Sequence, residues 1–377
     1  MIITRRNFFK TAAGTAFLLG YPKLSLASTT ASTKRLMIIL LRGGMDGLAA
    51  LPPIGDKGLA DLRRSILINS PIKLDGIFSI HPDLKFLENE YRNNTAAFVH
   101  ATSFPYTGRS HFEGQNIMEG GGGTPGETIS GWVGRAMKLS NLSSVAFSLP
   151  IPLILRGGLD NSNRYPATLI EPPSAAYDAV LRNWQEDPSL TEMGDKLNSL
   201  RMLGAGSRSA TAMVSFTSDQ MAKDDGPKVG LIDLVGFDTH AVQGSNVGKQ
   251  SGMIAQVDTM IEQFSKQMGE KWKETLVVTV TEFGRTAKEN GTQGTDHGWA
   301  SCILLAGGLV KKGQVVSDWP GLSSSNLFEG RDLKMTIDAR DIYSEVVSKV
   351  FNLDPAIVSK DVFLGYKPKK DWGLLRS

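Results

Sequence analysis

The chain has 377 residues, of which 41% are hydrophobic and 21% charged, which is typical of a globular protein with one large α/β domain or two smaller ones. Residues 28–377 carry 37 basic and 38 acidic side chains, a net charge of −1, so the charge gives no basis for a nucleic-acid partner. The one cysteine, Cys302, lies in an apolar run, and we expect it to be a small buried side chain.

The N-terminus has the features of a targeting segment. Paired arginines in "TRRNFFK" precede a short apolar stretch, and the small residues of 25–27 suit signal-peptidase cleavage. The stretch is too short and too rich in glycine and threonine for a stable membrane span. We therefore predict a twin-arginine signal peptide at residues 1–27, the twin-arginine export machinery as a partner, and a periplasmic or secreted location.

After a Ser/Thr-rich tether at 28–34, apolar runs alternate with helical patterns. Because strands that alternate with helices form a mostly parallel sheet covered on both faces, we expect an α/β fold in one domain, 28–377. We also expect one or two edge strands in the proline-interrupted segment 145–155, and a helical insertion near 174–224. Strands are predicted at 35–41, 96–101, 229–235, 275–281 and 300–306, and helices at 84–92, 110–119, 251–271 and 341–351.

Acids and imidazoles gather at the ends of these strands, where α/β folds place their sites. Mixed Asp and His side chains suit a divalent cation such as Zn²⁺ or Mn²⁺, and a single carboxylate–imidazole pair suits acid–base catalysis instead. Three of the five histidines lie beside acids; His81 is interpreted as a turn residue, and His100 as either structural or catalytic. The candidate ligands are Asp46, Asp238, His240, Glu282, Asp296 and His297.

A further polar cluster, Arg109-Ser110-His111-Phe112-Glu113, lies at the start of the helix predicted at 110–119. Ser110 and Glu113 have the spacing of a capping box, which by itself would explain the serine. The same hydroxyl at a helix N-terminus would also be favourably placed as a nucleophile or beside a bound anion. We therefore keep Ser110, His111 and Arg109 as candidate catalytic residues, with Arg109 as a partner for an anionic substrate.

Several stretches together resemble a family of twin-arginine-exported bacterial proteins, domain of unknown function 1501, which is grouped with the alkaline phosphatase superfamily. They are "LLRGGMDGLAALPP", "GRSHFEGQNIMEGG", "GFDTHAVQG", "VTEFGRT", "GTDHGWAS" and "GGLVKKGQVVSDWPGL". The resemblance implies an alkaline phosphatase-like fold and one or two metal ions, with zinc as the first candidate. It also implies that Ser110 attacks a small anionic ester. By position, Asp46, Ser110, Asp296 and His297 would surround one metal, and Asp238 and His240 would hold the second.

The chain departs from that superfamily at the second metal. Only Thr239 separates Asp238 from His240, where alkaline phosphatases have three residues, and no histidine follows His297. Either Glu282 or His111 substitutes for that histidine, or the second site is empty. Cys302 is misplaced for a sulfatase nucleophile. The expected function is a metal-dependent hydrolase of phosphate or sulfate esters. The alternative is a catalytically degenerate secreted binding or assembly protein. A nicotinamide oxidoreductase fits less well, because "GGMDG" lacks the G-x-G-x-x-G spacing.

Overall fold

A mostly parallel sheet forms the centre of the computed structural model, which describes residues 33–148, 150–164 and 209–376. Within these residues nine strands join in the order β10-β4-β9-β8-β1-β7-β5-β6, with β11 beside β4. The strands predicted from the five apolar runs are all present. The sheet comprises β1 (Arg35–Arg42), β4 (Ala96–Ser103), β5 (Ser143–Phe147), β6 (Asp160–Arg164), β7 (Val229–Val235), β8 (Thr275–Val280), β9 (Ser301–Ala306), β10 (Val315–Val316) and β11 (Ile337–Asp338).

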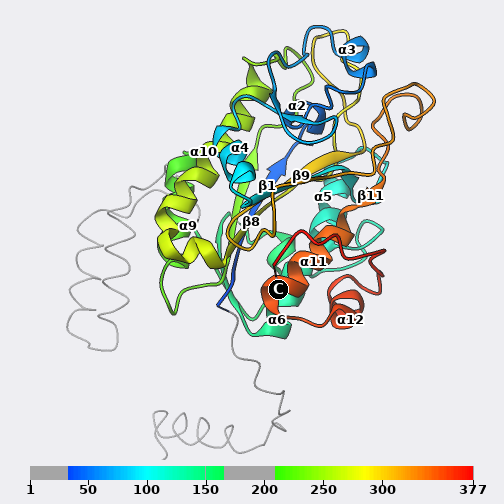
Figure 1. Ribbon diagram of the computed structural model, residues 1–377. Helices are drawn as coiled ribbons and strands as arrows, with labels where there is room; N and C mark the ends of the chain where they lie inside the picture. The colour runs from blue at the N-terminus through cyan, green and yellow to red at the C-terminus, as the bar shows by residue number, and fades with distance from the viewer. Residues whose placement is uncertain (1–32, 149, 165–208, 377) are drawn as a thin grey trace, which may run out of the picture. The chain divides into compact units, whose positions relative to one another are not determined.

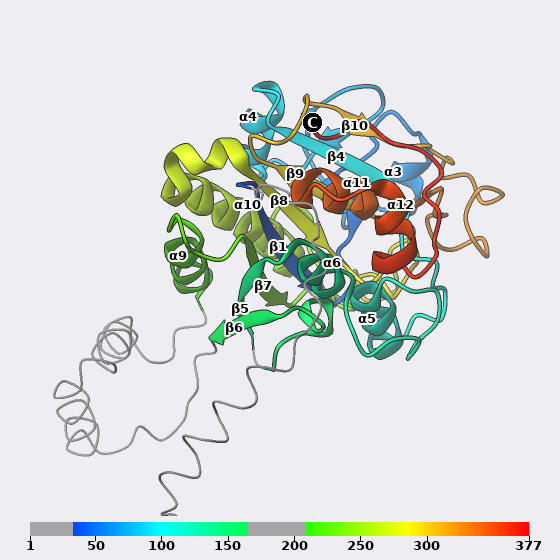
Figure 2. The same ribbon diagram turned by 90° about the horizontal axis from the view of Figure 1, so that it is seen from below.

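Helices cover both faces of this sheet, as predicted (Figure 1). Successive side chains of β1 point to opposite faces: Leu36, Ile38 and Leu40 enter one core, and Met37, Ile39 and Leu41 enter the other. Figure 2 shows α4, α9 and α10 on one side of the sheet and α5, α6 and α11 on the other. These helices are α4 (Lys85–Arg92), α5 (His111–Gly120), α6 (Trp132–Ser140), α9 (Ala210–Met221), α10 (Lys249–Met268) and α11 (Ala339–Phe351).

The direction of β9 decides where the late polar residues lie. β1 pairs in parallel with both β7 and β8, whereas β9 is antiparallel to both β8 and β4. An antiparallel strand begins at the edge of the sheet where its neighbours end. Residues that precede β9 therefore meet the residues that follow β7 and β8, a point that the apolar runs alone did not show.

One sequence prediction about the periphery needs correction, and another lies mostly outside the described residues. In segment 145–155 the strand β5 is not an edge, because β7 and β6 flank it, and the polar strand β6 forms the edge instead. Of the helical insertion predicted near 174–224, residues 174–208 lie outside the described residues. The described helix α9 packs into the same core as α10, so it is part of the main domain.

Short helices and strands complete the described part of the chain. None of the described helices is long and apolar enough to cross a membrane. A small hairpin stands apart from the main sheet. The short elements are α2 (Gly47–Ala50), α3 (Gly58–Leu62), β2 (Ile72–Lys73), β3 (Ser79–Ile80), η1 (Leu153–Leu155), η2 (Gly269–Glu274), α12 (Pro355–Ile357) and η3 (Val358–Val362).

Candidate metal centre

Three histidines and one aspartate meet at the edge of the sheet where the parallel strands end. Asp238 and His240 follow β7, His297 precedes β9, and His111 is the first residue of α5, which follows β4. A close backbone approach makes this possible: Gly43, just after β1, has φ +113°, and a Cβ there would collide with the backbone nitrogen of Asp238. The glycine-rich turn after β1 thus lets the β7 loop lie against it.

The carboxylate of Asp238 is the centre of the cluster. Its Oδ1 lies 3.0 Å from Nε2 of His240 and 3.2 Å from Nε2 of His297, and its Oδ2 lies 3.4 Å from Nε2 of His111. The Nε2 atoms of His240 and His297 are 3.0 Å apart. The ligand atoms of His111, Asp238 and His297 all lie within 4.8 Å of one another.

Each imidazole is held through its other nitrogen. Nδ1 of His111 lies 2.8 Å from Oε1 of Glu282, and Nδ1 of His240 lies 3.1 Å from Oδ1 of Asp296. Nδ1 of His297 lies 2.7 Å from the backbone carbonyl of Arg109. Partners of this kind behind the ligand atoms are typical of histidine metal sites, because they fix the ring and raise the basicity of Nε2.

These partners decide which ring nitrogen carries the proton. A carbonyl oxygen and an ionised carboxylate only accept hydrogen bonds, so each Nδ1 is the donor, and each neutral ring presents an Nε2 lone pair. Nε2 of His111 is buried and has no hydrogen-bond partner among the described residues. Lone pairs from His240 and His297 only 3.0 Å apart repel unless a cation or a proton balances them. The donor set therefore fits a divalent metal ion of the borderline class.

Electrostatics at the cluster favour ionised carboxylates. Burial by itself would raise the pKa of Asp238, but the hydrogen bond and charge of Arg285, whose Nη1 lies 2.6 Å from Oδ1, hold this pKa below its usual range. The hydrogen bond to Glu282 raises the pKa of His111, and burial lowers that of His297. Without a metal, the ring of His111 would therefore hold a proton more readily than the ring of His297.

The cluster is rigid on one side and open on the other. The buried ring of Phe283 packs against His111 and His297, with centroid distances of 4.9 and 5.2 Å. The side chains of Asp238 and His240 are 40% and 47% exposed. A molecule from solvent can therefore reach the face of the cluster opposite Phe283.

Asp46, predicted as a metal ligand, is committed elsewhere. It is buried, and its two oxygens accept hydrogen bonds from the guanidinium of Arg63 at 2.7 and 2.9 Å. Oδ2 also accepts from Gln243, and Oδ1 caps α2 through the N–H of Leu48. With four donors in place, this carboxylate stabilises the loop after β1, and it is not among the side chains that meet around Asp238.

Glu282 and Asp296 lie behind the histidines. Besides His111, the buried Glu282 accepts hydrogen bonds from the backbone of Gly43 and from Gln115, which holds its pKa low although burial opposes this. Arg285 pairs with Asp238 and not with Glu282. Glu282 and Asp296, both predicted as ligands, therefore each orient a histidine. For Glu282 the sequence had left three roles open, those of a ligand, a base or a salt-bridge partner, and the structure makes it a hydrogen-bond acceptor of His111 instead.

The segment before α5 differs from the expected capping box. Ser110 occupies the N-cap position, but its side chain makes no capping hydrogen bond. The hydroxyl of Tyr106 takes over, since it accepts from the N–H of Ser110 and donates to Glu113 at 2.6 Å. The hydroxyl of Ser110 also forms a hydrogen bond with that of Tyr106.

Arg109 is not available as predicted for an anionic substrate. Its guanidinium bonds to the buried carboxylate of Asp332 at 2.7 Å and to Glu329. Its φ of +58° is unusual for a residue with a side chain, and its carbonyl is the acceptor of His297. Arg109 therefore acts through its backbone, as a holder of one imidazole.

Two supporting residues escaped the sequence analysis. Gln115 lies one helical turn after His111, so the i, i+4 spacing on α5 was a signal for it. Asn290 donates to Oδ1 of Asp296 at 3.1 Å and to the carbonyl of His240 at 2.8 Å, and its place in a long loop gave no signal.

The remaining titratable candidates have structural roles. His100 is fully buried, its Nε2 contacts the carbonyl of Leu51 at 3.1 Å, and burial lowers its pKa to about 4. His81 accepts from the N–H of Asp83 in a turn, as interpreted, but it is fully buried. Cys302 is buried as predicted, and it has a free thiol.

Replacing Glu282 by glutamine is expected to weaken metal binding by about 10- to 100-fold, the usual cost of losing a partner behind a ligand. The amide keeps the shape but removes the charge that fixes Nδ1–H of His111. Competition with a chromophoric chelator measures the affinity, and Glu262→Gln on the surface of α10 is the matched control. An unchanged affinity would contradict the orienting role, and complete loss of metal would make Glu282 a ligand.

Taken together, the fold and the site define an α/β protein with a three-histidine, one-aspartate cluster at the carboxyl edge of a mostly parallel sheet. The chain belongs to the family described as "Protein of unknown function (DUF1501)", whose model matches residues 168–363. No curated protein matches it in sequence.

Several solved structures are similar to this chain at low sequence identity. One is a protein in the alkaline phosphatase superfamily from Vibrio parahaemolyticus, with 10% identity, a TM-score of 0.40, and coverage of 85% of this chain and 68% of that one. Another is the zinc complex of the C-terminal periplasmic domain of EcEptC from Escherichia coli, with 10% identity and a TM-score of 0.40. The match covers 92% of this chain and 93% of that one. A third is the phosphonate monoester hydrolase of Agrobacterium radiobacter, with 11% identity and a TM-score of 0.39. The match covers 90% of this chain and 79% of that one. At these values the likeness carries no conclusion about activity.

Proposed function

We propose that this chain is an exported, metal-dependent hydrolase that cleaves phosphate or sulfate esters, with Ser110 as the nucleophile. One observation carries the proposal: three imidazole Nε2 atoms converge on the carboxylate of Asp238 while each Nδ1 is fixed by an acceptor. A single ion would be held by His111, Asp238, His240 and His297, and zinc suits this donor set. A divalent cation there would supply Lewis-acid stabilisation of the charge that develops on the ester.

The residues around Ser110 suit attack on an anionic ester. Its hydroxyl contacts that of Tyr106 and makes no capping bond to α5, and Ser110 directly precedes the proposed ligand His111. The first N–H groups of α5 lack intrahelical acceptors, and the positive end of the helix favours an anion. Oγ of Ser110 would bond to phosphorus or sulfur while the bond to the ester oxygen breaks, and the proton of the hydroxyl would leave with that oxygen in the alcohol. Water would then hydrolyse the serine ester, which releases the inorganic anion and restores the serine.

Export is part of the same proposal. The paired arginines and the small residues of 25–27 favour transfer by the twin-arginine machinery to the periplasm or the exterior. This route carries folded proteins, so the cluster would be assembled before export.

Replacing Ser110 by alanine is expected to lower turnover of nitrophenyl phosphate or nitrophenyl sulfate by at least about 100-fold, since no attacking group remains. The metal content of the variant should stay unchanged, because Ser110 is not one of the proposed metal ligands. Mass spectrometry of the unaltered protein, quenched with acid during turnover, should find a phosphoryl or sulfuryl group on Ser110. Ser323→Ala, on an exposed loop, is the control. Turnover that persists in Ser110→Ala would disprove the nucleophile.

The alternative is a secreted binding or assembly protein that keeps the fold. The pairing of Asp46 with Arg63 and of Arg109 with Asp332 favours it, since a predicted metal ligand and a predicted substrate-binding residue both have structural partners. A metal-loaded protein without turnover on either ester would support this alternative.

A further inference from the structure

Gln243 lies at the centre of a buried hydrogen-bond network beside the candidate metal centre. Its side chain is fully buried, and it follows His240 by three positions in the loop after β7. Nε2 donates to Oδ2 of Asp46 at 2.7 Å, and Oε1 accepts from the hydroxyl of Thr295 at 2.6 Å and from that of Thr239 at 3.0 Å. All three partners are themselves buried. The amide therefore joins three loops: the one after β1, the one after β7 and the one before β9.

The partners fix which way round this amide lies. A carboxylate that pairs with a guanidinium only accepts hydrogen bonds, so the NH2 group faces Asp46 and the amide oxygen faces the two hydroxyls. The hydroxyl of Thr295 accepts from Nε of Arg285 at 3.2 Å, which leaves its own hydrogen for Gln243. Nη1 of the same arginine donates to Oδ1 of Asp238 at 2.6 Å. Donation thus runs in one direction from Arg285, through Thr295 and the amide, to Asp46.

The two threonines stand beside metal ligands in the chain. Thr239 separates Asp238 from His240. Thr295 lies two positions before His297. The backbones of the two loops also meet, because the N–H of Thr295 donates to the carbonyl of Thr239 at 3.1 Å. One acceptor atom, the amide oxygen, therefore ties the loop that carries two of the proposed ligands to the loop that carries a third.

These two loops need to be held together before a cation binds. Nε2 of His240, on the first loop, lies 3.0 Å from Nε2 of His297, on the second, and their lone pairs repel. Hydrogen bonds in a buried network are stronger than the same bonds in water, and the polar groups freed by breaking them would lose their partners without gaining water. The amide of Gln243 therefore opposes the separation that the repulsion favours.

We propose that Gln243 is a positioning residue of the metal centre: it holds the loop after β7 against the loop before β9, so that the ligand atoms of the two loops converge on one ion. This inference rests on the proposed function, since it requires the metal that the hydrolase would use. Asp46, predicted as a ligand, then supports the metal only indirectly, by orienting the amide. Asp46→Asn keeps an oxygen that can accept the bond from Gln243.

Gln243→Met tests the assignment, because methionine has a similar length and makes neither hydrogen bond. We expect it to weaken zinc binding to the purified full chain by about 10-fold, the smaller loss seen when a partner behind a ligand is removed. Competition with a chromophoric chelator measures this affinity. The absorption spectrum of the cobalt(II)-loaded protein should change as well, because it reports the number and geometry of the ligands around the ion. A purely structural loss would leave that spectrum unaltered.

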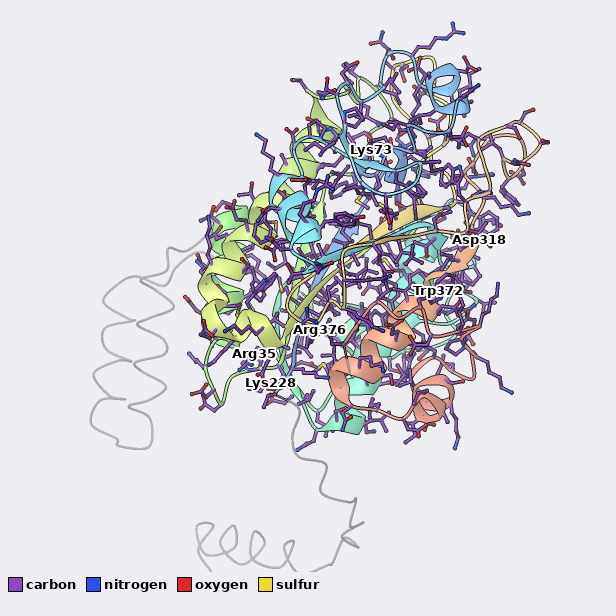
Figure 3. The ribbon with its side chains drawn as sticks, in the orientation of Figure 1. Arg35, Lys73, Lys228, Asp318, Trp372 and Arg376 are labelled. Carbon is purple, nitrogen blue, oxygen red and sulfur yellow. The ribbon has the colours of Figure 1, made fainter. Side chains whose placement is uncertain are left out.

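Two controls and a double-mutant cycle isolate the effect. Tyr343→Phe removes another buried hydrogen bond, which runs from its hydroxyl to the carbonyl of Thr279, and should leave both readouts unchanged. Lys73→Met introduces the same new side chain at the exposed end of the small hairpin (Figure 3). If Gln243 acts through Thr295, then Gln243→Met combined with Thr295→Val should lose less affinity than the product of the two single losses.

Three results would each overturn this inference alone. They are an unchanged affinity and cobalt spectrum in Gln243→Met, an equal loss in Tyr343→Phe, and single losses that multiply fully in the cycle. If Gln243→Met fails to fold, as judged by its thermal midpoint, Thr239→Val and Thr295→Val decide the question, because each removes one hydroxyl; unchanged zinc affinity in both would overturn the inference. An unaltered chain that binds no zinc would overturn the proposed function together with it.

Discussion

Replacing Asp238 by asparagine is expected to lower the metal affinity by more than about 100-fold, the upper end of the loss seen when only a partner behind a ligand is removed. Among the described residues, Asp238 is the carboxylate that pairs with all three histidines, and its charge offsets that of the buried Arg285. An amide of the same shape retains the packing but lacks the negative charge that a divalent cation requires. Ester turnover, where it is present, should fall in parallel.

Metal analysis of the purified protein, together with chelator competition, measures this effect. Asp318→Asn, in a surface loop, is the matched control and should keep its metal. The thermal midpoint in the presence of a chelator separates metal loss from unfolding. A variant that binds metal as tightly as the unaltered chain would rule out the cluster as a metal centre, and the hydrolase proposal would fail with it.

Replacing Asp46 by asparagine is expected to lower the free energy of unfolding by about 3 kcal/mol while leaving the metal content unchanged. The buried guanidinium of Arg63 would lose the only carboxylate that pairs with it among the described residues. We expect the lower end of the 3–5 kcal/mol cost of breaking a buried pair, because Arg63 also donates to the carbonyls of Thr286 and Ala287.

Urea unfolding and metal analysis on the same samples test both halves of this expectation, with Asp61→Asn on the exposed side of α3 as the control. The two readings of Asp46 predict opposite results. A ligand of the alkaline phosphatase type would cost metal and little stability, whereas the observed ion pair costs stability and no metal. Loss of metal in Asp46→Asn would restore the role that the family resemblance implies.

The sequence predicted the strands well because they are buried on both faces. A run such as 35–41 has no polar face, and only a strand within a covered sheet or a buried helix accommodates it; the short length excluded the helix. The same logic placed the Asp238 and His240 loop at the carboxyl edge. It also predicted that several Asp and His side chains would gather there, because the ends of parallel strands meet.

The division of roles within the site was beyond that logic. Asp46, Asp296 and Glu282 look alike in the sequence as acids at strand ends. Their roles differ because one meets Arg63 and the other two meet the Nδ1 atoms of histidines. Each of these contacts joins segments separated by 17 to 171 positions. No local pattern records them.

The sequence by itself determined the sheet, its two apolar faces and the chemical types available at its edge, because burial and side-chain alternation are properties of short segments. The tertiary structure alone decided which side chains converge, that β9 runs against its neighbours, and that Asp238 rather than Asp46 is the shared carboxylate. The physical reason is that a carboxylate takes its function from the cation or hydrogen-bond donor nearest to it, and that neighbour is set by packing between distant loops.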